Sequence, residues 1–330
     1  MAGLGLVQRV VMSNKRKRPQ VPAVVTSKYF GAGPSTFFHT AAPRKGSLPA
    51  LLGAAPHTLF MGTQASDNAI DGEVPFFTNE NAFWHIIGDA LGFRRGFHMR
   101  RDEAVDSIRP HLLHPLESEC SYEEARDRFL AAGFAMWDVV AESERAGSLD
   151  MHIVNPRFHD VKGSCAEHTT IRRICFATGQ GSAKIFRGAW KAWLATPGAF
   201  KAAPDAASQA VFAKYVQHSP DDSEPHSEPI ELLVMESVSP AAVPLVAVNS
   251  HKKRVAAYTA AGRLDLVAAG APRAAAYAWK RSCWLSSSAF EGVLHPTARE
   301  ATRFGRRPSD LLDNEADEDC TEAGAEDETL

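Results

Sequence analysis

The first 66 residues of the chain contain no aspartate or glutamate, although they contain eight lysines and arginines. Residues 309–330 show the opposite bias, with ten acidic residues and no lysine or arginine. The intervening residues, 67–308, are nearly neutral, with 28 basic and 29 acidic side chains. This asymmetry predicts two solvated arms of opposite charge attached to a neutral folded body.

The sequence also lacks the patterns typical of membrane and zinc proteins. No apolar run reaches the roughly 18 residues that a membrane-spanning helix needs, and the start has no small-residue cleavage pattern of a secretory signal. The five cysteines include no CxxC pair, which disfavours a zinc ribbon or a clustered iron–sulfur site. We therefore expect free thiols in a reducing compartment and no membrane association.

The basic arm contains the run NKRKRP at positions 14–19. Four consecutive basic residues are typical of a nuclear-import signal or of an arm that binds phosphates. An acid-free start that contains arginine also fits a mitochondrial presequence, or a tail with no address. Because the basic residues cluster, we expect a nuclear protein, with the mitochondrion as the alternative. Proline and glycine punctuate residues 19–56, so we assign 1–50 to a disordered arm, 51–308 to the folded domain and 309–330 to a disordered acidic tail.

Strands and helices alternate within the folded domain. Short apolar runs predict buried strands at 58–62, 134–140, 174–179 and 230–236. Helical spacing of Phe83, Ile86, Ile87 and Ala90 predicts one helix, and a capping box at Ser121 and Glu124 predicts the start of another. Strands separated by helices indicate a parallel sheet covered on both faces. Residues 241–275, rich in alanine and valine, form a predicted insertion.

Ligands of such a sheet bind beyond the carboxyl ends of its strands. GTQAS at 62–66 follows the first strand and ESVSPAA at 236–242 follows the last. Both segments contain small residues and hydroxyls, which let backbone amides approach a phosphate or a base. Asn81 stands at the head of an apolar helix, just after Phe76 and Phe77. It fits either a helix cap or an amide held over a stacked base.

Five segments, in order, resemble the uracil-DNA glycosylase superfamily and especially its hypoxanthine-DNA (deoxyinosine) glycosylase branch. They are LFMGTQAS, FFTNENAFWHIIGDALG, AAGFAMWDVVAESERAGSLDMHIVNP, CFATGQGSAKIF and ESVSPAA. The resemblance covers roughly residues 59–240, and NAFW and WDVVAESERAGSLD are its most specific parts. It implies a three-layer α/β/α sandwich around a parallel four-stranded sheet. It also implies hydrolysis of the N-glycosidic bond of a deaminated base in DNA, without a metal or cofactor.

The same resemblance implies roles for individual residues. Asn81 matches the active-site amide, and Gln64, which stands where methionine is usual, is a second catalytic candidate. The candidates for binding the base and the DNA are Gly62, Thr63, Ser66, Phe76, Phe77, Asn155, Ser237 and Ser239. We expect a monomeric, monofunctional glycosylase acting on hypoxanthine or uracil. The alternatives are an enzyme directed to uracil or thymine mismatches, and a catalytically silent module that binds DNA or a partner.

Overall fold

The computed structural model describes residues 44–97, 108–217, 228–240 and 272–303. These residues belong to one compact unit, which spans Ala41–Leu330. The predictions for residues 1–43 of the basic arm, for 241–271 of the insertion and for the acidic tail at 309–330 concern segments outside the described residues. Among the residues that are described, no helix has the length and apolar character needed to cross a membrane.

A five-stranded, fully parallel sheet forms the centre of the molecule, in the order β5-β2-β8-β10-β9. Its strands are β2 (Thr58–Gly62), β5 (Phe134–Asp138), β8 (Arg173–Phe176), β9 (Phe200–Ala202) and β10 (Ile230–Val234). The predicted four-stranded sheet is therefore corrected to five strands. The added strand, β9, has only three residues and lies at the sheet edge, where no long apolar run is needed.

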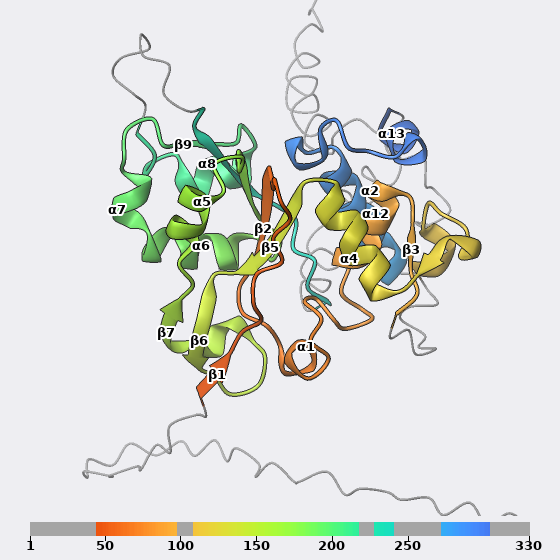
Figure 1. Cartoon of the computed structure of the whole chain (residues 1–330), viewed down its shortest axis with the longest axis horizontal. Helices are drawn as coiled ribbons and strands as arrows, with labels where there is room; N and C mark the ends of the chain where they lie inside the picture. Colours follow the sequence, from red (N-terminus) through yellow and green to blue (C-terminus); the bar gives the residue numbers. More distant parts are fainter. Residues whose placement is uncertain (1–43, 98–107, 218–227, 241–271, 304–330) are drawn as a thin grey trace, which may run out of the picture. The chain divides into compact units, whose positions relative to one another are not determined.

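Alternating side chains of the strands build two separate cores. Phe60 points into one core and its neighbours Leu59 and Met61 point into the other, although all three are fully buried. Because successive side chains of a strand face opposite sides, both faces of the sheet must be covered. The chain is thus a mixed α/β fold in three layers, as Figure 1 shows.

Two groups of helices provide the cover. The core around Phe60 is closed by α2 (Phe83–Leu91), α4 (Tyr122–Ala131), α12 (Pro272–Leu285) and α13 (Pro296–Arg303). The core around Met61 is closed by α5 (Val161–Glu167), α6 (Gln180–Ala189), α7 (Lys191–Leu194) and α8 (Ala206–Phe212). At α4 the predicted capping box is present. Glu124 N–H donates to Ser121 Oγ at 3.2 Å, and Ser121 N–H donates to Glu124 Oε2 at 2.9 Å.

A second, antiparallel sheet joins β1 (Arg44–Gly46), β6 (Val140–Glu144) and β7 (Val154–Phe158). Because β1 pairs with β6, the folded domain begins before residue 51, and the predicted boundary of the arm is corrected. The sequence RKG has no apolar alternation that could have predicted this strand. The remaining elements are β3 (Arg94–Arg95), β4 (Glu119–Cys120), α1 (Asp67–Asp71) and the short 3₁₀ helices η1 (Arg109–His111), η2 (Leu116–Ser118), η3 (Asp150–His152) and η5 (Ser288–Phe290).

Candidate active site

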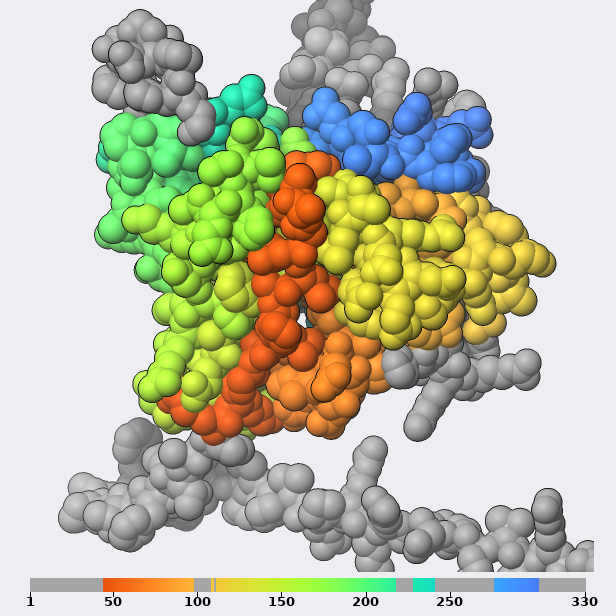
Figure 2. All heavy atoms as spheres, viewed as in Figure 1, coloured from red at the N-terminus to blue at the C-terminus, as the bar shows by residue number. Residues whose placement is uncertain are grey.

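Most of the predicted site residues line one cavity of about 670 Å³. They are Thr63, Gln64, Ser66, Phe76, Phe77, Asn81, Ser237 and Ser239. The cavity lies where β2, β5, β8 and β10 end, as expected for a parallel sheet. In Figure 2 a small opening lies between the red and orange segments, and teal atoms of residues 228–240 are visible inside it.

Gly62 does not itself line the cavity, but it sets the spacing of one wall. It pairs with Asp138 across β2 and β5. A Cβ atom on Gly62 would lie 2.1 Å from Asp138 Oδ1 and 3.3 Å from Phe76 Cζ. Only a residue without a side chain therefore allows the Asp138 carboxylate to approach residues 62–66, the first-motif loop, this closely.

Gln64 is bonded to the protein at both ends of its amide. Nε2 donates to the Lys45 carbonyl at 2.8 Å, and Oε1 accepts from Ser143 Oγ at 2.6 Å. These bonds connect the first-motif loop to β1 and β6. To contact a substrate, the Gln64 amide would have to break one of these two hydrogen bonds. The bonds are typical of a residue that positions a loop, and the catalytic role of Gln64 stays a prediction.

Two other first-motif residues also hold local structure. Ser66 caps α1, because its Oγ accepts from Ala69 N–H at 3.2 Å. Thr63 Oγ1 donates to Asp150 Oδ2 at 2.7 Å and lies 2.9 Å from Thr178 Oγ1. The loop after β2 is therefore held to the chain that follows β6 and to the chain that follows β8.

Phe76 and Phe77 form an aromatic wall of the cavity. The ring of Phe76 stacks on Phe83, with centroids 4.4 Å apart and an interplanar angle of 17°. The ring of Phe77 covers Gly72, where a Cβ would lie 2.6 Å from Phe77 Cε2. Phe76 adopts a φ of +54°, which is rare for a bulky residue and is often found at functional sites.

Buried side chains hold the backbone of this aromatic loop by its carbonyls. Trp84 Nε1 donates to Pro75 O at 2.8 Å, and Arg95 donates to the carbonyls of Phe77 and Thr78. Arg95 is 1% exposed, and burial lowers its pKa to about 10, so it stays charged near neutral pH. His85 Nε2 lies 3.1 Å from the Asn79 carbonyl, so a third buried side chain restrains the same loop.

The Asn81 side chain bonds the first residue of α2 and also borders the cavity, although the N-cap position itself is Ala82, which makes no side-chain cap bond. Its Oδ1 accepts from Phe83 N–H at 2.9 Å, at the first turn of α2. Its Nδ2 donates to none of the residues that the structure describes, and the side chain is among those lining the cavity. The two interpretations of Asn81 are therefore compatible, because each uses a different half of the amide.

Two carboxylates on the cavity wall were not singled out from the sequence. Asp138 Oδ2 accepts from Ser47 Oγ at 2.5 Å, and Asp150 Oδ2 accepts from Thr63 Oγ1. Burial, with a smaller contribution from the charge of Asp150, raises the pKa of Asp138 from 3.8 to about 6. Burial of its carboxylate also raises the pKa of Asp150, although the η3 turn that contains it is exposed.

The last-motif loop, residues 236–240, is held by α12. Lys280 Nζ donates to Ser239 O at 2.9 Å, and Trp284 Nε1 donates to Glu236 O at 2.7 Å. Lys280 is 2% exposed and its pKa is lowered to about 8 by burial, while the nearby Glu236 opposes that shift. Ser237 Oγ accepts from Ser239 N–H at 3.3 Å, which shapes the turn at the cavity edge.

Asn155 is the predicted site residue that the structure places elsewhere. It lies on the exposed strand β7 with a φ of +49°, and its Nδ2 donates to Glu144 Oε1 at 3.2 Å. Asparagine tolerates this backbone conformation better than most residues. The sequence VNP therefore fits a local distortion of β7, and not a wall of the cavity.

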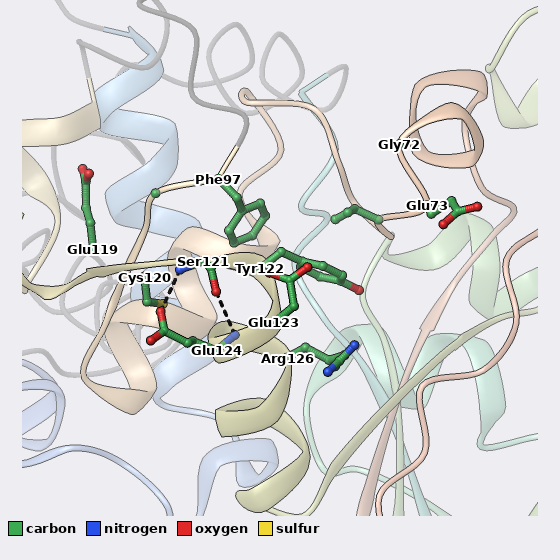
Figure 3. A pocket seen from close by; sticks show the side chains of 12 residues that line it. Gly72, Glu73, Phe97, Glu119, Cys120, Ser121, Tyr122, Glu123, Glu124 and Arg126 are labelled. Carbon is green, nitrogen blue, oxygen red and sulfur yellow. Dashed lines mark hydrogen bonds between the residues drawn. The ribbon is translucent and has the colours of Figure 1, made fainter.

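A second cavity, of about 690 Å³, lies at the start of α4 (Figure 3). Four glutamates line it: Glu73, Glu119, Glu123 and Glu124. Figure 3 shows Ser121 and Glu124 already bonded to each other in the capping box. A wall with this excess of negative charge disfavours a phosphate backbone, so this cavity is a poor candidate for a DNA site.

Neither a metal cluster nor a disulfide is found in the described part of the chain. No group of three or more His, Cys, Asp or Glu side chains there is arranged to hold a metal ion. The described cysteines, Cys120, Cys165, Cys175 and Cys283, are free thiols, as the sequence predicted for them.

Comparison with known proteins gives a distant likeness to solved structures. No family model matches the chain, and none of the curated proteins matches it. Among solved structures, the chain is similar to the solution NMR structure of "a putative Uracil DNA glycosylase from Methanosarcina acetivorans", with 20% identity and a TM-score of 0.37. The match covers 61% of this chain and 89% of that one. A function for this chain therefore has to be argued from its own cavity and motifs.

Proposed function

We propose that the chain is a monofunctional DNA glycosylase of the uracil-DNA glycosylase type. It would hydrolyse the N-glycosidic bond of a deaminated base, hypoxanthine or uracil, in DNA. The observation that supports this most is that the Phe76 ring and the Asn81 amide border one cavity, together with serine-rich loops at the strand ends. No part of that arrangement requires a cofactor for the reaction.

The aromatic wall suits a base that has been rotated out of the helix. An enzyme of this kind must hold an unstacked base, because the glycosidic bond is inaccessible within the duplex. Stacking a base on an aromatic ring contributes roughly 1–3 kcal/mol in single-strand binders. Phe76 is backed by Phe83 and its loop is anchored by Trp84 and Arg95, so little ordering remains to be done on binding.

The polar groups suit the leaving base and the attacking water. The Nδ2 atom of Asn81 can donate to a carbonyl oxygen of the base or orient a water molecule. The volume of about 670 Å³ falls in the range of roughly 300–1,000 Å³ that is common for small-molecule sites. Ser237 and Ser239 lie on the last-motif loop at the edge of the cavity, where they can meet the base or a flanking phosphate.

Excision assays on oligonucleotides test the proposal directly. Each substrate contains one hypoxanthine, one uracil or one mismatched thymine, as single or double strands, and abasic sites are detected by alkaline cleavage under single-turnover conditions. We expect excision of hypoxanthine or uracil, with no strand cleavage before alkali. Excision restricted to mismatched uracil or thymine supports the mismatch-directed alternative. DNA binding without excision of any base supports the silent module.

We further propose that the enzyme is nuclear, because four basic residues cluster at 15–18, and that it acts as a monomer. Microscopy of the tagged full chain distinguishes the nucleus from the mitochondrion. Sedimentation of the purified chain, alone and on DNA, measures its oligomeric state.

A further inference from the structure

Asp138 and Asp150 face the same cavity, and each is held by one hydroxyl group. Ser47 donates to Asp138 Oδ2, and Thr63 donates to Asp150 Oδ2. They come from different elements, because Asp138 ends β5 and Asp150 begins η3. Neither forms an ion pair with Lys, Arg or His among the described residues. Two neighbouring carboxylates without a direct cationic partner favour the retention of a proton.

The charges around this pair are few. Arg145 from the chain after β6 attracts both carboxylates, but its NH2 group donates to the Ala65 carbonyl. Asp67 and Lys45 form their own ion pair at 2.7 Å, and Asp67 acts on Arg145. The Ala65 N–H and the Ser47 hydroxyl favour the ionised form of Asp138, whereas burial and Asp150 oppose it more strongly. Among the described residues that line the cavity, Asp138 and Asp150 are the acidic ones.

We propose that Asp138 is a general acid that protonates the departing base, so that the site prefers deaminated purines to uracil. This inference rests on the proposed glycosylase function and specifies its substrate class. Asp138 is placed for the role by Gly62, whose lack of a side chain brings the carboxylate against the first-motif loop and near Phe76. A base stacked on Phe76 would lie beside that carboxylate.

The proposed step cleaves the glycosidic bond and transfers one proton from Asp138 to the base. The bond between C1′ and N9 of the purine breaks, and its electron pair moves onto the base. The proton of Asp138 moves to a ring nitrogen of the base, which leaves as a neutral molecule. Water adds its oxygen to C1′ and gives a proton to the Asp138 carboxylate, which restores the acid.

Purines and uracil differ in their need for this proton. The anion of uracil at N1 is delocalised onto two carbonyl oxygens, so uracil can leave without protonation. Hypoxanthine bound to the sugar keeps two unprotonated ring nitrogens, N3 and N7, which can take a proton as the bond to C1′ breaks, whereas both ring nitrogens of uracil are already substituted. General acid catalysis typically contributes about 10²–10⁴-fold to a rate. A proton donated by Asp138 should therefore speed the departure of hypoxanthine more than that of uracil.

Asp150 is a positioning residue in this scheme, because its negative charge helps to keep the proton on Asp138. The pKa of Asp138, about 6, makes the acid form the minor one at pH 8 and the major one at pH 5. Hypoxanthine excision should then fall about tenfold per pH unit above pH 6. Uracil excision should show no such fall over the same range.

The test compares Asp138→Asn and Asp150→Asn in the full chain, with Asp127→Asn as the control. Asp127 lies on the exposed face of α4, where its carboxylate is 67% exposed. Single-turnover excision of hypoxanthine and of uracil is measured from pH 5 to pH 8. We expect Asp138→Asn to slow hypoxanthine excision by about 10²-fold or more and uracil excision by less than about threefold. Asp150→Asn should move the midpoint of the hypoxanthine profile to lower pH, and Asp127→Asn should match the wild type.

Three outcomes overturn the inference. Equal losses on both bases in a folded Asp138→Asn variant would make the residue a structural support. Hypoxanthine excision that increases with pH through 6 would make Asp138 a base. If Asp150→Asn leaves the midpoint of the pH profile of hypoxanthine excision unchanged, the charge of Asp150 does not help to keep the proton on Asp138. Failure of the wild type to excise either base contradicts the proposed function itself, and is recognised before any variant is made.

Discussion

The Oδ1 atom of Asn81 accepts a hydrogen bond from the backbone N–H of Phe83 at 2.9 Å. The acceptor half of the amide is thus committed to the first turn of α2. Its donor half borders the cavity and is bonded to no described residue. Substitutions that remove one half or both can therefore separate the structural role of Asn81 from its chemical role.

Asn81→Asp keeps the acceptor and removes the donor. The aspartate carboxylate can accept the same hydrogen bond from Phe83 N–H, so the thermal midpoint should change little. The loss of one preorganised donor should slow excision by about 10²–10³-fold. Asn81→Ala removes both halves, and should cost about 1 kcal/mol of stability in addition to the same loss of rate. Single-turnover rates and thermal unfolding of both variants provide the measurement. An Asn81→Asp variant as fast as the wild type would leave Asn81 with its structural role alone.

Gly62→Ala should damage the site through a steric clash. The added methyl would lie 2.1 Å from Asp138 Oδ1, so the carboxylate or the β2–β5 pairing must move. Overpacking of this kind typically costs about 1–3 kcal/mol, and excision should fall more than stability does. Gly188→Ala is the matched control, because nothing lies within 4 Å of a Cβ there. It sits near the end of α6, where alanine should stabilise by up to about 1 kcal/mol. Equal stability of the two variants would contradict this account.

The sequence predicted the strands whose apolar runs are continuous. Thr58–Gly62 and Ile230–Val234 are almost wholly buried, so their composition is enough to identify them. The capping box at Ser121 was readable because both of its residues lie within one turn. Short edge strands such as Phe200–Ala202 were not readable, because their pairing with β10 supplies what their own three residues do not specify.

The sequence predicted the cavity residues that lie close together in one segment. It did not predict those that strand pairing brings to the cavity from distant parts of the chain. Asn81, Phe76 and Phe77 lie within six residues of one another, so a short stretch of sequence was enough to predict that they lie together. The environment of Asp138 depends on its parallel pairing with Gly62, which lies 76 positions earlier in the chain. That register depends on the whole sheet. Asn155 lies outside the cavity for the same reason, since the position of β7 follows from its pairing with β6.

Arg95→Lys tests whether the aromatic loop is preorganised. The guanidinium reaches the carbonyls of Phe77 and Thr78 at once, whereas an ammonium group cannot reproduce this fork. One buried carbonyl left without a donor should cost about 1–3 kcal/mol of stability. Binding of hypoxanthine DNA should weaken, because the loop must then be ordered on binding. Arg128→Lys is the control, since Arg128 is exposed and lies over the Phe93 ring at 5.9 Å. Unchanged DNA affinity in a less stable Arg95→Lys variant would limit Arg95 to folding.

The raised pKa of Asp138 predicts how stability depends on pH. Its pKa is about 6 in the folded chain and 3.8 in the reference state, so the folded chain binds the proton more tightly. Between pH 4 and pH 6 the contribution of this group to stability therefore declines as pH rises, and above pH 6 it stays low. Asp138→Asn removes the ionised form. It should be more stable than the wild type at pH 8, by on the order of 1–3 kcal/mol, and by less at pH 4. Denaturant unfolding of both proteins at pH 4 and pH 8 measures the difference in the free energy of unfolding. A gain in stability by Asp138→Asn that is smaller at pH 8 than at pH 4 would contradict the burial of this carboxyl group.

The basic arm should add DNA affinity that does not depend on the base. Residues 1–40 contain six lysines and arginines, four of them consecutive at 15–18. Each phosphate that such a residue neutralises contributes about 0.9 to the slope of log affinity against log salt concentration. Deletion of 1–40 leaves β1 intact, and should lower that slope by roughly 3–4 while single-turnover excision on saturating DNA stays the same. The full-length chain with Lys15→Gln, Arg16→Gln, Lys17→Gln and Arg18→Gln separates charge from length, and should reproduce most of the effect. If the slope is unchanged in both proteins, the run at 15–18 does not contact DNA, and its remaining role is that of an import signal.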